Sequence, residues 1–219
     1  MAVGRTRWNA AAHEYLGNLT TASIWYELGQ YEWRGGRTIP GITDDVPELG
    51  VREVVAVSQL PAAICAHRVG NTQRAHNLYL WAAGNYLRTD DEIAFFAVER
   101  NYQAFWEVYP MRAYALLCLE DWEEALVAVE FAERWAKKDR RARTSEAYQL
   151  QLQLIPSLLA LARYKLDPSA ENRRLAQKRL DLNTITSRNK SERLLCYFYL
   201  YNLRVHFGAD LLEQGGSRG

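Results

Sequence analysis

Residues 109–138 read YPMRAYALLCLEDWEEALVAVEFAERWAKK, and this stretch predicts two helices joined by a tight corner. After the corner, Ala125, Val129 and Ala132 recur at intervals of four and three residues, which is the spacing of one face of an α-helix. Ala113 gives the preceding helix a small residue on its own apolar face. Small side chains on both faces let two antiparallel helices approach closely, so we expect a helical hairpin.

The charges at the two ends of the second helix agree with this interpretation. Asp121 stands where an N-cap residue is expected, and Glu123 and Glu124 fall in the first turn. Lys137 and Lys138 fall in the last turn. Carboxylates at the N-terminus and cations at the C-terminus both interact favourably with the helix dipole.

A second copy of the same pattern lies upstream. Gly70 marks a corner, and Ala75, Tyr79 and Ala82 follow it at the same intervals of four and three residues. Ala63 precedes Ala75 by twelve residues, as Ala113 precedes Ala125. Two stretches of the chain therefore predict the same hairpin.

This pattern resembles the tetratricopeptide repeat, whose second helix carries A-x3-F-x2-A after a corner with an aromatic residue, a place that Trp122 takes here. The two copies lie 50 residues apart, whereas the repeat of that family has about 34 residues, so we expect at least one extra helix between them. The resemblance covers about a quarter of the chain. It implies stacked hairpins with a concave groove that holds an extended peptide or a partner's helix.

The whole chain of 219 residues fits this class, because 48% of it is hydrophobic and only six prolines and thirteen glycines interrupt it. We predict an all-α fold, an α-α superhelix of about nine or ten helices. Residues 1–214 are expected to form a single helical repeat-like domain with an irregular loop at 34–50, followed by a flexible tail at 215–219.

Several helix boundaries are predicted from prolines and caps. A first helix is expected to run from Asn9 to about Gly35 without a break. A helix over residues 91–106 should end before Pro110, which then opens the next helix. Later in the chain, Pro168 is expected at the first position of a helix that Asp167 caps.

Motifs of catalysis, metal binding and membrane insertion do not appear in the sequence. It contains no phosphate loop, no H-E-x-x-H and no C-x-x-C, and its acidic loop cluster at 44–48 lacks a partner at the spacing of a metal site. No run of 18 apolar residues occurs, and the net charge is only +1. We therefore expect a cytoplasmic protein that is not an enzyme, with no cofactor, no metal and no membrane contact.

The predicted function is that of a non-catalytic scaffold or adaptor that binds a peptide or partner protein in a helical groove. The first helix of each pair should line the concave side of a superhelix. The residues expected to touch the partner are therefore Gln59, Arg68, Tyr102, Tyr109 and Arg112.

Three alternatives remain open on the sequence. The basic segments 134–143 and 163–179 predict nucleic-acid binding if they form one strip. That hypothesis assigns the phosphate contacts to Arg140, Arg141, Arg143, Arg173 and Arg174. A helical enzyme with the 37–50 loop as a lid is the second alternative. The third is self-association, because residues 196–201 place aromatic side chains on every side of the last helix, which must be buried or meet a partner.

Overall fold

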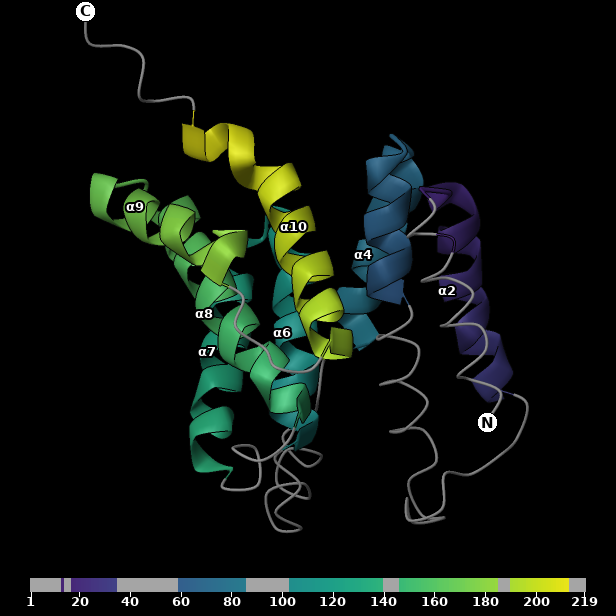
Figure 1. Ribbon diagram of the computed structural model, residues 1–219, viewed down its shortest axis with the longest axis horizontal. Coiled ribbons are helices and arrows are strands. Elements are labelled where there is room, and N and C mark those ends of the chain that lie inside the picture. The colour runs from purple at the N-terminus through teal and green to yellow at the C-terminus, as the bar shows by residue number, and fades with distance from the viewer. Residues whose placement is uncertain are drawn as a thin grey trace, which may run out of the picture. The chain divides into compact units, whose positions relative to one another are not determined.

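The computed structural model of the chain describes His13 and residues 17–34, 59–85, 103–139, 146–184 and 190–212 (Figure 1). In these ranges every regular element is helical and no strand occurs, which confirms the all-α class. The elements in chain order are α2 (Leu19–Arg34), α4 (Thr72–Asn85), α6 (Gln103–Cys118), α7 (Trp122–Lys138), α8 (Glu146–Leu166), α9 (Ala170–Arg179), the 3-10 turn η2 (Leu182–Thr184) and α10 (Lys190–Leu212).

These are eight helices with both bounds among the described residues, rather than the nine or ten predicted. Residues 59–68 are also helical and lead into the corner before α4. The chain divides into two compact units, residues 1–89 with 118–120, and residues 90–117 with 121–219. The predicted loop at 34–50 and the tail at 215–219 lie outside the described residues, apart from Arg34 at the end of α2.

In the first unit, α2 packs against the helical residues 59–68 through small side chains. Ala22, Ala62 and Ala63 have no exposed surface. The buried Ser23 donates a hydrogen bond from Oγ to the carbonyl oxygen of Ala62 at 3.0 Å, which ties the two helices together. Small residues at these positions let the backbones approach closely enough for that bond.

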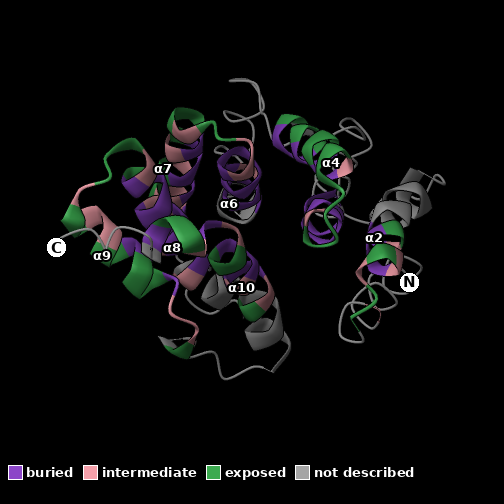
Figure 2. Cartoon of the chain, turned by 90° about the horizontal axis from the view of Figure 1, so that it is seen from above, coloured by how far each residue is buried: buried purple, intermediate pink, exposed green. Residues whose placement is uncertain are grey.

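In the second unit, α7 lies beside α8, and α8 also adjoins α9 and α10 (Figure 1). Figure 2 shows the buried residues of these helices facing one another. Between α6 and α7, the rings of Tyr109 and Phe131 stand 4.4 Å apart at their centroids. Ser157 of α8 has its Oγ 2.9 Å from the carbonyl oxygen of Arg179, so it can donate a hydrogen bond to the last turn of α9. Each helix is thus held by a packed core and by specific polar contacts.

Three corners of the described chain are built in the same way. The residues that turn the chain are Gly17, Gly70 and Glu120, with φ angles of 76°, 78° and 64°. The next residue in each corner donates its backbone N–H to the carbonyl oxygen five residues earlier, in the pairs Asn18–His13 (2.8 Å), Asn71–Ala66 (3.0 Å) and Asp121–Leu116 (3.0 Å). This is the Schellman motif that ends a helix on a left-handed residue.

The same residue that closes one helix also caps the next. Asn18, Asn71 and Asp121 accept the backbone N–H of the residue four positions later, in each case an alanine at 3.0 Å: Ala22, Ala75 and Ala125. These three alanines are at most 1% exposed. A corner without spare residues forces the two helices to be antiparallel neighbours, and the alanine directly after it keeps them close.

Two of these corners were predicted, and the third, at Gly17, was not. We expected one unbroken helix from Asn9 to about Gly35, but the chain turns at Gly17 and α2 begins at Leu19. Ala22 and Tyr26, both buried, hold the positions that Ala125 and Val129 hold after the later corner. The three caps are spaced by 53 and 50 residues, so the corner recurs at a nearly constant interval.

Two other boundaries were predicted wrongly. Pro110 lies inside α6 rather than at the start of a helix. Its ring removes one helical hydrogen bond and crowds the preceding turn, and the burial of Tyr109, Pro110 and Met111 offsets that cost. The cap of α9 is Ser169 and not Asp167, since the side chain of Ser169 accepts a hydrogen bond from the backbone N–H of Asn172. Asp167 instead accepts a hydrogen bond from Nδ2 of Asn172 at 2.9 Å.

Because Glu120 occupies the position that glycine fills in the other two corners, replacing it with glycine should stabilise the protein. An L-residue in the left-handed region costs about 1 kcal/mol or more, and the greater freedom of glycine in the unfolded chain offsets part of that gain. We expect Glu120→Gly to raise the free energy of unfolding by about 0.5–1 kcal/mol in urea titrations. Gly70→Ala is the matched opposite change and should lower it by about 1 kcal/mol. A loss of stability in Glu120→Gly would contradict this account of the corner.

Candidate interaction surfaces

Between residues 197 and 208, one side of α10 carries two exposed apolar side chains. We call this the α10 face, and it comprises Tyr197, Tyr201, Arg204, Val205 and Gly208, which share one side of a helix by their spacing. Tyr197 is 46% exposed and Val205 is 55% exposed. The rings of Tyr197 and Tyr201 stack with centroids 5.8 Å apart and planes within 9° of parallel. The α10 face therefore carries a stacked tyrosine pair in which Tyr197 is exposed and Tyr201 is half-buried.

Contacts on the opposite side of α10 fix which residues point outward. Tyr164 of α8 donates its hydroxyl to the carbonyl oxygen of Asp210 at 2.9 Å, and Gln177 of α9 donates Nε2–H to the carbonyl oxygen of Leu211 at 2.8 Å. Tyr199 is buried and meets Tyr114 of α6 edge to face at 5.9 Å. Because these bonds reach the backbone of α10, they set the rotation of the helix about its axis.

A second apolar surface lies on α4, which we call the α4 patch: Leu80, Trp81 and Gly84. Leu80 is 51% exposed and Trp81 is 56% exposed, although Tyr79 beside them is buried. A side chain placed at Gly84 would meet nothing within 4 Å, so the surface around it is open. Trp81 is the largest exposed apolar side chain among the described residues, and tryptophan is the residue most enriched at binding hot spots.

The five residues predicted to line a groove have different environments. Gln59 and Tyr109 are buried, with 3% and 6% of their surface exposed. Arg68 is exposed. Arg112 is half-buried and pairs with Glu124 at 3.4 Å, which ties α6 to α7. Tyr102 lies outside the described residues. That a partner touches these side chains stays a prediction.

The basic segments are only partly described. Arg140, Arg141 and Arg143 lie outside the described residues. Arg174 is exposed, whereas Arg173 is half-buried with its guanidinium 5.7 Å from the ring centre of Tyr164. With three of the five arginines outside the described residues, the strip of the nucleic-acid hypothesis stays a prediction.

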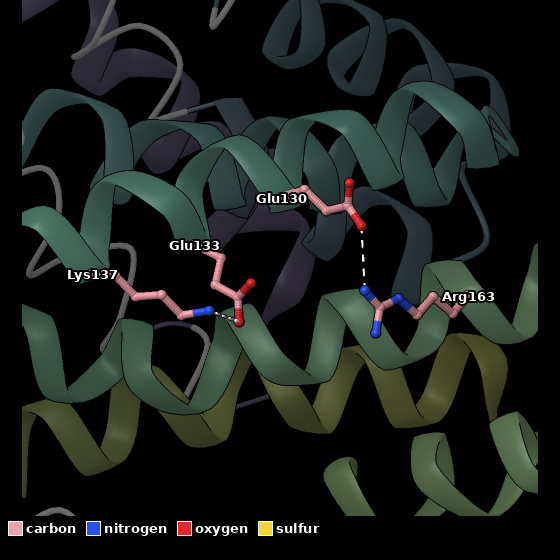
Figure 3. Close-up of polar contacts among 4 residues, drawn as sticks. All are labelled: Glu130, Glu133, Lys137 and Arg163. Atoms are coloured by element: carbon pink, nitrogen blue, oxygen red, sulfur yellow. Dashed lines mark hydrogen bonds and ion pairs between the residues drawn. The ribbon is translucent and has the colours of Figure 1, made fainter.

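Two cations of these segments are engaged by acids of α7. Figure 3 shows Arg163 of α8 paired with Glu130 at 3.3 Å, and Lys137 paired with Glu133 at 3.1 Å. Each pair leaves less positive charge to attract phosphate. The Arg163–Glu130 pair also bridges α7 and α8, so this basic side chain has a role in joining helices.

The thiol of Cys118, at the end of α6, is held in its protonated form. Burial raises the pKa of the Cys118 thiol to about 12, and a hydrogen bond with Tyr79 offsets part of that rise. The thiol is therefore protonated at neutral pH and is a poor nucleophile. Among the described residues, no group of three histidine, cysteine or acidic side chains could hold a metal ion. The acidic cluster at 44–48 and the proposed lid at 37–50 lie outside them.

His67 should make the stability of the fold depend on pH. Burial lowers the pKa of His67 below its ordinary value of 6.5, so the folded protein favours the neutral imidazole. As the pH falls below 6.5, the unfolded chain binds this proton more readily, and the stability that His67 contributes is lost. We expect the melting temperature to fall less between pH 7 and pH 5 in His67→Gln than in the original protein. His76→Gln, an exposed histidine after the same corner, is the control, and equal slopes in both variants would contradict the prediction.

Comparison with known proteins gives no relative for this chain: no family model, no curated protein and no solved structure matches it. Within the described helices, none combines the length and the apolar character that a membrane crossing requires.

Proposed function

We propose that this chain is a non-catalytic scaffold that binds a peptide or a partner protein on its helical surface. The α4 patch carries the proposal, because it pairs a leucine and a tryptophan that are each more than half exposed. A soluble protein gains little from exposing two such large side chains side by side unless they are covered in a complex. Partner binding through Leu80 and Trp81 would bury both.

The recurring corners support a scaffold role. Three corners share the same Schellman turn and the same buried alanine, and hairpins built on such corners are the kind of unit that stacks into a superhelix. We propose that the hairpins form such a superhelix, with Arg68 and Arg112 near the path of the partner. The tetratricopeptide resemblance implies that the partner contacts the first helix of each hairpin. In this proposal the partner also contacts α4, which is the second helix of its hairpin.

The test places a photo-crosslinking residue at position 81 of the full chain and, as the control, at position 73 of the same helix. Gln73 is exposed like Trp81, but it lies on the first turns of α4, where its side chain bonds Asn77 at 3.2 Å. We expect irradiation in extract from the native source to give one discrete adduct at position 81 and not at position 73. Mass spectrometry then identifies the partner.

Binding of the identified partner is measured by calorimetry with purified proteins. A tryptophan hot spot contributes about 2 kcal/mol or more, so Trp81→Ala should weaken binding by about 30-fold. Gln73→Ala should change it less than about twofold. Equal labelling at positions 73 and 81, or full affinity in Trp81→Ala, would overturn the proposal.

Nucleic-acid binding is the second candidate, and the composition of α9 favours it. This helix carries Arg174, Lys178 and Arg179 on its exposed surface against a single acid, Glu171. Binding to single-stranded RNA or DNA through these cations should fall steeply as salt rises, because phosphate contacts release counterions. Retention on heparin at low salt that is lost in Arg174→Ala/Lys178→Ala would support it, and no retention would exclude it.

A further inference from the structure

We propose that the α10 face is the interface of a homodimer, in which α10 of a second copy of this chain packs antiparallel against it. The inference is independent of the α4 patch. It begins with the exposed side chains of α10. This helix leaves Tyr197, which stacks on the half-buried Tyr201, and Val205 in solvent.

Gly208 is the observation that points to a second helix. A glycine inside a helix destabilises it by about 1 kcal/mol relative to alanine. Among the described residues, no neighbour requires glycine here, because an added Cβ would meet only Cγ of Arg204, at 4.0 Å. Gly208 is half-exposed, and a missing side chain at this position is explained if another helix approaches closely there.

The face is complementary to itself in one arrangement. In an antiparallel pair related by a two-fold axis midway between residues 202 and 203, Tyr197 faces Gly208 of the other copy, and Tyr201 faces Arg204. The large ring then fills the space above the glycine. The guanidinium of Arg204 lies against a tyrosine ring, which is a favourable cation–π contact.

A parallel pair lacks this complementarity. It would set Arg204 against Arg204 and Tyr197 against Tyr197, so that like charges meet and the glycines face each other with no side chain between them. An isologous antiparallel contact uses every residue of the face twice, and it closes, so the assembly stops at two copies. A second copy therefore matches the α10 face in both shape and charge.

The size of the face sets the expected strength. From Tyr197 to Gly208 the face is about 16 Å long. A face of this length buries less surface than the roughly 800 Å² per partner of a standard interface. We therefore expect a reversible dimer with a dissociation constant in the micromolar range. Sedimentation equilibrium of the full chain from about 1 to about 500 µM should show a monomer–dimer equilibrium.

One matched pair of variants and a third variant test the interface. Val205→Gln and Val127→Gln make the same change at two valines that are 55% and 60% exposed, on α10 and α7. We expect Val205→Gln to weaken dimerisation at least tenfold and Val127→Gln to leave it unchanged. Gly208→Gln should also weaken it at least tenfold, while raising the melting temperature of the dilute monomer by about 2 °C, because the helix loses a glycine. That opposite response separates a blocked interface from a damaged fold.

The antiparallel pairing has its own test. Tyr197→Ala and Gly208→Tyr should each weaken the dimer, but the double variant moves the large residue to the other side of the same contact and should recover much of the affinity. Additive losses would overturn the antiparallel pairing. A wild-type chain that is monomeric at all concentrations, or a dimer that Val205→Gln leaves intact, would overturn the interface. Crosslinking at position 81 is unaffected in either case, so the two proposals can fail separately.

Discussion

Ala125→Leu should lower the free energy of unfolding by about 2–3 kcal/mol, because it forces extra volume into the closest part of a hairpin. Ala125 has no exposed surface, and its backbone N–H bonds the carbonyl oxygen of Asp121, the residue that both ends α6 and caps α7. Directly before it in the chain, Glu124 pairs with Arg112 across the same two helices at 3.4 Å. A leucine cannot fit there unless the helices separate, and separation would strain the corner.

The control for this prediction is Val127→Leu, two residues later on the same helix. Val127 is 60% exposed, so the extra carbon enters solvent and the stability should change by less than about 0.5 kcal/mol. Both variants are compared by urea titration. Equal effects would mean that the small residue after the corner has no role in helix approach.

The equivalent alanines explain how much of the fold the sequence could predict. The corners before α4 and α7 were predictable because the cap, the alanine four residues later and the next apolar residue all appear in order. The information is local: a Schellman turn and a cap involve only residues within one turn of each other. Such motifs can be recognised without knowledge of the rest of the fold.

The corner at Gly17 was missed although it has the same local elements. Gly17 and Asn18 are followed by Ala22 and Tyr26, as Gly70 and Asn71 are followed by Ala75 and Tyr79. Apolar residues on both sides of Gly17 continue a helical pattern through it. Periodicity alone does not detect a turn that inserts no loop residues between two helices. Comparison with the other corners at an interval near 50 residues would have revealed it.

The exposed surfaces could not be predicted, because they depend on long-range contacts. Residues 196–201 place aromatic residues all around α10, so periodicity gives no preferred side. The outward side is decided by Tyr164 and Gln177, which bind the backbone of α10 from 46 and 34 residues away. A contact distant in sequence also decides the environment of Tyr109. The sequence assigns this residue to a groove, and in the structure its ring packs against that of Phe131.

Trp122→Ala should lower the free energy of unfolding by about 2–3 kcal/mol, the second large effect expected in this protein. Trp122 is the first residue of α7. Its indole ring meets the ring of Phe207 of α10 edge to face, with the two ring centroids 6.2 Å apart. Nζ of Lys165, from α8, lies 5.1 Å from the centre of the Trp122 ring and 5.2 Å from that of Phe207, and it pairs with Asp210. One side chain at the corner thus joins three helices.

A double-mutant cycle isolates the contribution of the cation. Lys165→Met keeps most of the apolar stem and removes the charge, so the coupling between Trp122→Ala and Lys165→Met reports the cation–π contact. We expect about 1 kcal/mol, because the Lys165 side chain is only 17% exposed. The matched pair is Lys138 with Trp135, which is closer at 4.4 Å but lies within one helix, and Lys138 is exposed. Its coupling should be smaller despite the shorter distance, since water screens the charge and no second helix is held by it. A larger coupling for Lys138 would show that distance, not burial between helices, decides the strength of these contacts.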